Sequence, residues 1–307
     1  NRITTDIHAV GLGMHARADN PELLRAKSLA IPVYSFPEYI YQQSINKKRV
    51  VIAGSHGKTS TTAMIMHVLK YWKMDFDYMV GAQLEGFDLM VRLSDAPVII
   101  LEGDEYPDGA INRTPKFLFY KADIGLITGI AWDHVNIFPT YEEYVQQFGK
   151  FIESVQPNGK LIYNIEDNDL VKEVAKHSVT KISYQTFNHR IENGVSIIQV
   201  DEKDFPLQIF GKHNLQNMAG AMQVCIQLGL TPFQFASAIQ SFSGAAKRLE
   251  KIVSNNSVTV YRDFAHSPSK LTATIKAAAE QFEGRKIIAV FELHTYSSLS
   301  EGFLNEY

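Results

Sequence analysis

A short loop with two glycines, set between an apolar run and a helical pattern, constrains the fold of this chain more than any other feature. Residues 50–64 read VVIAGSHGKTSTTAM. The apolar run is typical of a strand buried on both faces of a parallel sheet. Gly54 and Gly57 allow positive φ and close approach of the backbone to a ligand. The N–H groups of residues 57–59 can then point at one anion, at the positive end of the helix dipole.

The side chains that follow the loop suit the phosphates of a nucleotide. Lys58 can reach β- and γ-phosphate oxygens as a point charge, and the Thr59 hydroxyl can bind Mg²⁺. The full pattern of such loops, G-x-x-x-x-G-K-[ST], requires a glycine where this chain has Ile52. A glycine turn with a solvated lysine is the alternative reading. The buried strand before the loop and the helix after it favour the phosphate site.

Short, nearly continuous apolar runs alternate with helical patterns along the chain. The runs suit buried parallel strands, and they cover residues 49–54, 97–103, 124–130 and 160–164. Spacing and capping residues predict helices over residues 59–71, after Thr140 with Glu143, over residues 214–228 and from Thr231-Pro232. This alternation predicts an α/β fold, with a central, mostly parallel sheet of the P-loop type flanked by helices.

The texture of the sequence changes twice, which divides the chain into three parts. Residues 1–48 are predicted as an incomplete N-terminal α/β domain, and residues 49–244 as the central domain that carries the loop. Residues 245–307 are predicted as an incomplete, Rossmann-like C-terminal domain. Its β-α-β pattern has strands at 258–264 and 286–293 around a helix that begins at Ser267-Pro268.

The composition argues against several functional classes. Net charge is −3 and no basic tail or stripe is present, which argues against nucleic acid or a membrane as partner. No apolar run approaches the roughly 18 residues of a membrane span. Cys225 is the one cysteine, so a disulfide framework is excluded and a reducing compartment is expected. We therefore expect a cytoplasmic protein.

An acidic segment follows one of the predicted strands. Residues 101–108 read LEGDEYPD and place four carboxylates at the end of that strand. Such groups repel one another unless cations neutralise them, and hard oxygen ligands suit Mg²⁺. Glu102, Asp104 and Glu105 are the candidate ligands, with a solvated acidic loop as the alternative.

Two further segments carry side chains suited to a metal and to a base. Residues 129–138, GIAWDHVNIF, place His134 next to an aspartate just beyond a strand, which favours a metal ligand over a structural histidine. Residues 210–221, FGKHNLQNMAGA, place Asn214 and Asn217 on one helical face. Amide groups can read the adenine edge as donor and acceptor together.

In combination these motifs resemble the Mur ligase family. GSHGKTSTT resembles G-[ST]-x-G-K-[ST]-[ST], the short loop of these ligases and their folylpolyglutamate synthetase relatives. The acidic segment resembles E-x-D-E-S-D, and the histidine segment resembles N-x-x-x-D-H. FGKHNLQNMAGA resembles G-x-H-N-x-x-N-x-x-A-A. The motifs follow in the family's order, and the resemblance runs from about Gly13 to the end of the chain.

The resemblance implies ATP and Mg²⁺ as cofactors. Glu105 aligns best with a Mg²⁺ ligand, ahead of Glu102 and Asp104, and His134 aligns with the ligand of a second Mg²⁺. Lys58, Glu105 and His134 are the implied catalytic residues, and Thr59 joins Glu105 and His134 as metal ligand. The implied ATP-binding residues are Gly54, Ser55, His56, Gly57, Lys58, Thr59, Ser60, His213, Asn214, Asn217, Arg248 and Asp263.

Three more segments extend the resemblance. AAKRLE, residues 245–250, resembles the interdomain segment whose arginine, here Arg248, reaches a phosphate. RDFAHSPSK resembles D-[DY]-x-[AG]-H-x-P, which brings Asp263 to the ribose or γ-phosphate region. RADNPEL resembles a segment of the UDP-sugar-binding domain, so residues 1–48 correspond to that domain and residues 245–307 to the ligase domain. The implied substrate-binding residues are Asp19, Asn20, His266 and His294.

The resemblance also implies an ATP-dependent ligase that acts on UDP-N-acetylmuramate through an acyl phosphate and forms ADP and phosphate. In members that add L-alanine, two arginines of P-H-R-Y-S-R stand where this chain has Thr295 and Ser298. Arginine forks suit the carboxylate of a small amino acid. We therefore predict the murein tripeptide L-alanyl-γ-D-glutamyl-meso-diaminopimelate as acceptor, with L-alanine as the alternative.

Two hypotheses from other classes stay open. A P-loop kinase or GTPase would share the loop and would release phosphate without an amine, but the His134 and Asn214 segments argue against it. A catalytically inactive nucleotide-binding module would bind ATP without turnover. The intact set of Lys58, Thr59, Glu105 and His134 argues against that module.

Overall fold

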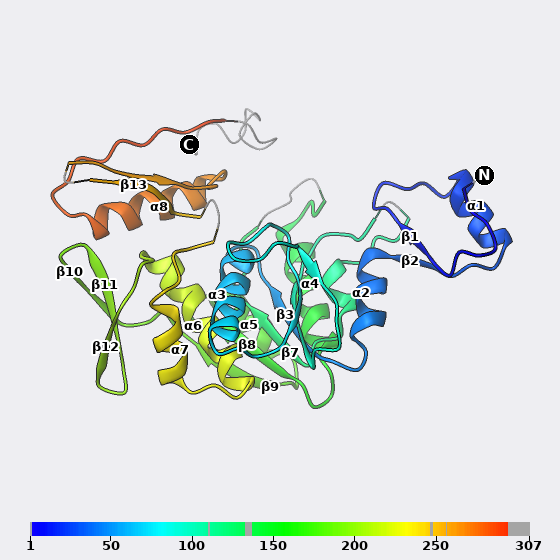
Figure 1. The fold of residues 1–307 in the computed structure, drawn as a ribbon, viewed down its shortest axis with the longest axis horizontal. Coiled ribbons are helices and arrows are strands. Elements are labelled where there is room, and N and C mark those ends of the chain that lie inside the picture. The colour runs from blue at the N-terminus through cyan, green and yellow to red at the C-terminus, as the bar shows by residue number, and fades with distance from the viewer. Residues whose placement is uncertain (1, 110, 133–136, 246–247, 256, 294–307) are drawn as a thin grey trace. The chain divides into compact units, whose positions relative to one another are not determined.

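The structure, a computed structural model, describes residues 2–109, 111–132, 137–245, 248–255 and 257–293 (Figure 1). The chain divides into two compact units. The first comprises Asn1–Lys58, Asp75–Val80 and Val91–Ser183, and the second comprises Thr59–Met74, Gly81–Met90 and Tyr184–Tyr307. Within the described ranges, no helix is long and apolar enough to cross a membrane.

The first unit begins with two strands, each followed in the chain by a helix. The elements are β1 (Val10–Leu12), α1 (Pro21–Ser28), β2 (Val33–Ser35) and α2 (Phe36–Ser44). The two strands pair in parallel. The Asn20 side chain caps α1, and Ser35 and Glu38 form a reciprocal capping box at α2. Local chemistry therefore determines where both helices begin.

A seven-stranded sheet forms the centre of the first unit, in the order β5-β4-β6-β3-β7-β8-β9. Its strands are β3 (Lys48–Ala53), β4 (Asp77–Met79), β5 (Val91–Arg92), β6 (Val98–Glu102), β7 (Ile124–Ile127), β8 (Lys160–Asn164) and β9 (Thr180–Tyr184). β3 pairs in parallel with β6 and β7, and the edge pair β4–β5 is antiparallel. The predicted mostly parallel sheet is confirmed, with β3, β6, β7 and β8 at the predicted apolar runs.

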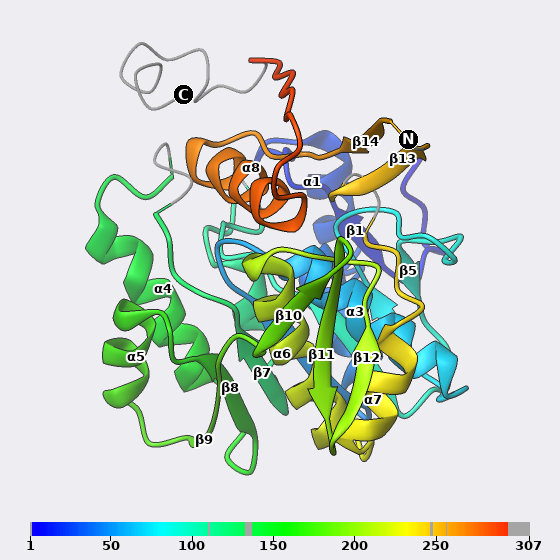
Figure 2. The ribbon, with the colours of Figure 1, turned by 90° about the vertical axis from the view of Figure 1, so that its left-hand side faces the viewer.

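Burial on both faces explains those runs. Val50, Val51 and Ile52 of β3 are fully buried, as expected for a central parallel strand. The core of this unit is completed by η1 (Lys116–Phe119), α4 (Tyr141–Ser154) and α5 (Asn168–Ala175). The rings of Phe117 and Phe151 stack with centroids 4.9 Å apart. Figure 2 shows α4 and α5 side by side, and Thr140 caps α4 as predicted.

The second unit contains helices and two small antiparallel sheets. Its elements are α3 (Lys58–Tyr71, whose first residue belongs to the first unit), β10 (His189–Glu192), β11 (Val195–Val200), β12 (Lys203–Pro206), α6 (Lys212–Gln227), α7 (Pro232–Ile239), β13 (Glu250–Ser254), β14 (Thr259–Arg262) and α8 (Pro268–Gln281). β10, β11 and β12 form an antiparallel meander, visible in Figure 2. The helices predicted over residues 59–71 and 214–228 correspond to α3 and α6, and the helix predicted to start at Thr231-Pro232 corresponds to α7.

The predicted C-terminal β-α-β pattern is correct for its helix and wrong for its second strand. β14 forms, but it pairs antiparallel with β13, and α8 begins at Pro268 as predicted. Residues 286–293 form no strand in the described part of the chain, and Ile288 and Val290 are 78% and 95% exposed. An apolar run becomes a strand only when a neighbouring strand accepts its backbone hydrogen bonds.

Candidate functional site

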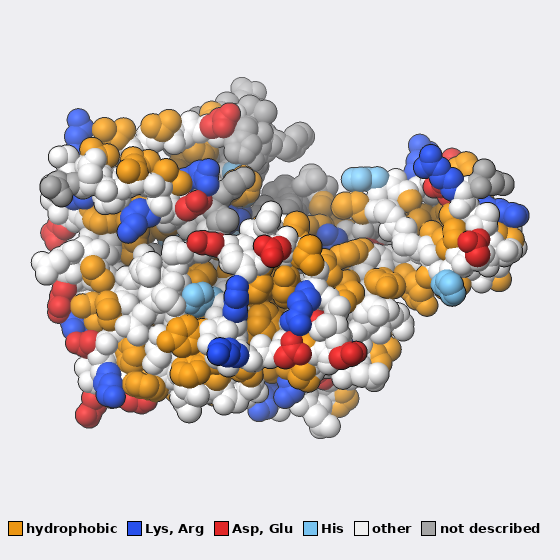
Figure 3. Space-filling model, in the orientation of Figure 1, with side chains coloured by type: hydrophobic (Ala, Val, Ile, Leu, Met, Phe, Trp, Pro, Cys, Tyr) orange, Lys and Arg blue, Asp and Glu red, His pale blue; other side chains and the backbone are white. Residues whose placement is uncertain are grey.

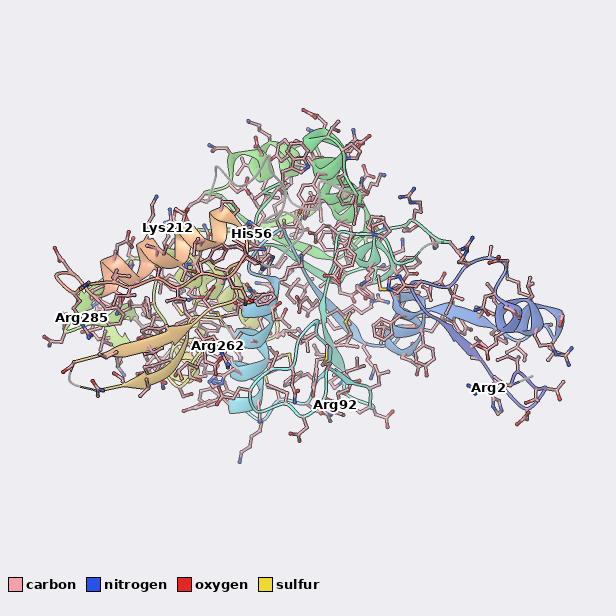
Figure 4. The ribbon with its side chains drawn as sticks, turned by 90° about the horizontal axis from the view of Figure 1, so that it is seen from above. Arg2, His56, Arg92, Lys212, Arg262 and Arg285 are labelled. Carbon is pink, nitrogen blue, oxygen red and sulfur yellow. The ribbon has the colours of Figure 1, made fainter. Side chains whose placement is uncertain are left out.

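The 54–57 loop joins β3 to α3 with the backbone geometry that its glycines predict. Gly54 and Gly57 have φ of +129° and +84°, a region that side chains other than glycine rarely adopt. A Cβ atom on Gly54 would lie 2.0 Å from Oγ1 of Thr128. The Thr128 hydroxyl donates to the carbonyl oxygens of Ala53 and His56. The loop is thus held against the end of β7, and Figure 4 labels His56 within it.

Lys58 lies at the end of this loop and is already bound to two oxygens. Its Nζ donates to the Gly54 carbonyl at 2.7 Å and to Oε2 of Glu105 at 2.7 Å. Burial lowers the pKa of Lys58, but attraction to Glu105, Asp104 and Glu102 outweighs it and raises the pKa overall. The amine therefore carries its positive charge at the place where the sequence predicts a phosphate.

The acidic segment brings its predicted residue to the loop. Glu105 is fully buried, and its carboxylate forms the ion pair with Lys58. Asp104 instead pairs with Lys116 at 3.3 Å, and Glu102 is the last residue of β6. Of the three candidate carboxylates, that of Glu105 thus contacts the loop lysine, and its role as a metal ligand stays a prediction.

A tyrosine that the sequence analysis did not select completes this network. The phenol oxygen of Tyr144, in α4, lies 2.8 Å from Ser55 Oγ and 3.1 Å from Glu105 Oε1. Ser55 Oγ also accepts the backbone N–H of Ala131 at 2.8 Å. In the sequence, Tyr144 stands four residues before Phe148 on the apolar face of a helix, so the pattern identifies it only as a core residue.

The donor atoms present suit a magnesium ion. No group of three or more His, Cys, Asp or Glu side chains that could hold a metal occurs among the described residues. Mg²⁺ needs no such cage, because it is bound through one or two carboxylates together with substrate phosphates. A buried Glu105 beside a loop with two positive-φ glycines fits that arrangement. Thr59 is the second residue of α3, and His134 lies outside the described residues.

The amide pair predicted to read adenine lies on α6 of the second unit. Asn214 and Asn217 are 6% and 8% exposed, and Asn214 Nδ2 donates to the Phe210 carbonyl at 3.0 Å. Burial lowers the pKa of His213, against an opposing effect of Asp263. The first turns of the helix thus carry an imidazole with a lowered pKa, followed by two buried amides, and their role toward a base stays a prediction.

Three other predicted residues gather around Phe264 of the second unit. The Asp263 carboxylate accepts the backbone N–H groups of Leu249 at 2.7 Å and Ala265 at 2.6 Å. The Arg248 guanidinium lies 5.1 Å from the centroid of the Phe264 ring. Nδ1 of His266 lies 2.9 Å from the Phe264 carbonyl oxygen. Figure 4 labels Arg262, the last residue of β14 and the neighbour of Asp263 in the sequence, which forms an ion pair with Glu250 of β13.

The remaining predicted residues stand apart from these groups. Asn20 accepts the backbone N–H groups of Glu22 and Leu23 as the cap of α1. Asp19 forms an exposed ion pair with Arg17. His294, with Thr295 and Ser298, lies outside the described residues. On the face shown in Figure 3, acidic and basic side chains are interspersed.

Comparison with known proteins covers nearly the whole chain. The family model for the Mur ligase middle domain matches residues 52–225, and that for the Mur ligase glutamate ligase domain matches residues 247–302. The UDP-N-acetylmuramate–L-alanine ligase of Persephonella marina is 32% identical over 95% of this chain and 64% of its own length. The corresponding ligase of Caldicellulosiruptor saccharolyticus is 32% identical over 93% and 65%. The chain thus spans just under two thirds of the length of these curated relatives.

Solved structures share the fold. The UDP-N-acetylmuramate-alanine ligase of Thermotoga maritima aligns with a TM-score of 0.70 at 20% identity, over 91% of this chain and 65% of the other. The UDP-N-acetylmuramate:L-alanyl-γ-D-glutamyl-meso-diaminopimelate ligase of Neisseria meningitides aligns with a TM-score of 0.68 at 20% identity, over 76% of this chain and 78% of the other. At this identity the likeness concerns the fold.

Proposed function

Because the chain belongs to the Mur ligase family, we propose that it is an ATP-dependent ligase that forms an amide bond on UDP-N-acetylmuramate and releases ADP and phosphate. The observation that supports this most directly is the Lys58–Glu105 ion pair at the 54–57 loop. A mostly buried, charged amine and a fully buried carboxylate meet where the nucleotide phosphates and their metal ion are predicted to bind. We propose that the reaction takes place in the cytoplasm, where ATP and UDP-N-acetylmuramate are available.

The ion pair suggests how the site takes up its nucleotide. Lys58 is bound to two oxygens, those of Gly54 and Glu105, and an incoming phosphate offers oxygens of greater negative charge. When the amine turns to the phosphate, Glu105 Oε2 becomes available to a cation. Glu105 and Thr59, with His134, would hold Mg²⁺, which when bound neutralises charge on the phosphoryl oxygens.

The chemistry proposed for this site is an acyl-phosphate ligation. The carboxylate of UDP-N-acetylmuramate attacks the γ-phosphorus of ATP, and ADP leaves in line with the attack. Lys58 offsets the charge that spreads over the phosphoryl oxygens. An amine then attacks the carbonyl carbon of the acyl phosphate, loses its proton and expels inorganic phosphate. Positioning of the reactants supplies most of the acceleration.

The acceptor that the comparisons favour is L-alanine. Both of the curated relatives described above are L-alanine ligases by name, and this was the alternative to the tripeptide in the sequence analysis. The tripeptide remains the second candidate, because Thr295 and Ser298 replace the two arginines that suit a small amino acid. A tripeptide carries its other carboxylates at a distance from the reacting amine, so its site needs no arginine pair there.

A product assay on the whole chain tests the proposal. ADP release is measured with ATP, Mg²⁺ and UDP-N-acetylmuramate, in the presence of L-alanine, of the tripeptide or of no amine. Amine-dependent release supports the ligase, and the preferred amine identifies the acceptor. Phosphate release that needs no amine would indicate a kinase or GTPase instead. ATP binding without turnover in any condition would indicate an inactive nucleotide-binding module.

A further inference from the structure

Tyr144 connects two parts of the site that lie far apart in the sequence. Its side chain comes from α4 and is fully buried, with its ring packed edge-on against Phe148 at 5.3 Å and tilted against Phe138 at 5.4 Å. Its phenol oxygen reaches Ser55 in the loop after β3 and Glu105 in the segment after β6. Packing thus holds the phenol at the contact between these two segments.

The donors and acceptors in this contact have a definite direction. An ionised carboxylate only accepts hydrogen bonds, and a phenol has a single proton. Tyr144 is therefore the donor in its contact with Glu105 Oε1, 3.1 Å away. The phenol also donates to Ser55 Oγ, 2.8 Å away, and Ser55 Oγ accepts the backbone N–H of Ala131 as well. The chain of bonds runs from the end of β7 to the carboxylate.

Lys58 and Tyr144, which both donate to Glu105, differ in how a nucleotide affects them. Lys58 binds Oε2 with a charged amine, which a phosphate attracts. Tyr144 binds Oε1 with a neutral phenol, which a phosphate attracts far less. A buried carboxylate that loses a donor without replacement pays a large desolvation penalty. Tyr144 is thus a donor that can stay when Lys58 leaves.

We propose that Tyr144 is a positioning residue that keeps the Glu105 carboxylate anchored through Oε1 while Lys58 turns to the nucleotide, so that Oε2 is presented to the metal ion. This inference rests on the proposed function, because it assigns Glu105 to Mg²⁺. It makes the phenol, through its contact with Glu105, a determinant of the metal-dependent part of nucleotide affinity. The metal-independent part, carried by the loop and Lys58, does not depend on it.

The chain offers a matched control for this role. Tyr120 is also fully buried and belongs to the same hydrophobic core. Its hydroxyl has no hydrogen-bond partner in the described part of the chain. Tyr120→Phe therefore removes the same atom from the same core without removing a bond to Glu105.

The test measures ADP affinity by calorimetry, once with Mg²⁺ and once with EDTA, for the whole chain and for both tyrosine variants. In Tyr144→Phe we expect the ratio of ADP affinity with Mg²⁺ to ADP affinity with EDTA to fall about tenfold, because removing a partner of a metal ligand usually costs at least this much. The affinity in EDTA should stay unchanged. Tyr120→Phe should keep the ratio of the unaltered chain. Equal ratios in the two variants would overturn the positioning role and leave the proposed function intact.

A double substitution separates action through Glu105 from a general effect on the loop. In a Glu105→Gln background, Tyr144→Phe should no longer change the ratio, because the anchored carboxylate is gone. A further fall in that background would overturn the inference. If the unaltered chain binds ADP no better with Mg²⁺ than with EDTA, the proposed function fails first, and the inference fails with it. Thermal unfolding of each variant verifies that it is folded under the conditions of the binding measurement.

Discussion

The 54–57 loop of the first unit and the 263–266 loop of the second unit both carry predicted nucleotide-binding residues, but they bond their side chains differently. In the first, Lys58 binds Glu105, and Ser55 contacts Tyr144. In the second, the Asp263 carboxylate accepts the backbone N–H groups of Ala265, within the loop, and of Leu249, just before β13. One loop ties functional side chains to one another, and the other uses its carboxylate to shape its own backbone.

This difference suggests distinct responses to a ligand. In the first unit, under the proposed function, an incoming phosphate would replace Glu105 as the charged partner of Lys58 in a site whose side chains are already in position. In the second unit, each oxygen of the Asp263 carboxylate already accepts a backbone N–H group, so this side chain holds the backbone in place. Substitutions in the first loop should therefore change the chemical step, and those in the second unit should change affinity or stability.

The largest expected effect is on the rate of turnover. Lys58→Ala should lower kcat for ADP release by about 10²–10³-fold, because it removes a preorganised charge from the transition state. Asn217→Ala, in the second unit, should raise KM for ATP and leave kcat nearly unchanged, as expected for uniform binding of a remote group. Steady-state kinetics distinguish the two.

Wild-type turnover by a folded Lys58→Ala chain would remove the loop from the proposed site. A loss of kcat in Asn217→Ala as large as that in Lys58→Ala would instead abolish the contrast between the two units.

The next effect is on stability. A Cβ atom at Gly54 would meet Thr128 Oγ1 at 2.0 Å and the Thr128 backbone nitrogen at 2.9 Å, at a φ of +129°. Gly54→Ala should therefore lower the free energy of unfolding by about 3 kcal/mol, as strain adds to overpacking. Gly229 has a φ of +99° but nothing within 4 Å of its Cβ position. Gly229→Ala should cost about 1 kcal/mol, and equal losses in urea titrations would contradict the steric argument.

The smallest effect is a pH dependence that differs between the units. Burial lowers the pKa of His67, although its hydrogen bond to the Ala238 carbonyl opposes the shift. As pH falls below about 6.5, His67 is therefore protonated in the unfolded chain before it is protonated in the folded chain. The contribution of His67 to the free energy of unfolding is therefore complete above that pH and declines below it. His67→Gln should flatten this decline between pH 7 and 5.

The first unit offers the contrasting group. Burial raises the pKa of Asp77, but hydrogen bonds from Ser94 and the charge of Lys47 outweigh it and lower the pKa below 3.8. Its contribution is present above that value and is lost as pH falls through the folded pKa. Asp77→Asn should thus leave the pH dependence of the free energy of unfolding unchanged between pH 7 and 5. If urea titrations show that Asp77→Asn flattens the decline as His67→Gln does, the contrast between the units is wrong.

Much of the secondary structure was predictable because its signals are local. The apolar runs that became β3, β6, β7 and β8 are buried on both faces, which their composition already requires. Capping residues such as Thr140 and Thr231 act on the N–H groups of the next turn, so they mark helix starts from the sequence. Residues 286–293 were predicted wrongly, because strand formation depends on a partner that composition does not supply.

The sequence by itself determined the 54–57 loop and the residue types that can hold a phosphate, because backbone freedom at glycine and the strand-to-helix pattern act over a few residues. Only the tertiary structure decided that Glu105 meets Lys58 across 47 residues of chain and that Tyr144 reaches Ser55 across 89. Those contacts depend on the strand order that makes β3 the neighbour of both β6 and β7. Strand order follows from burial of the whole sheet, which no short segment specifies.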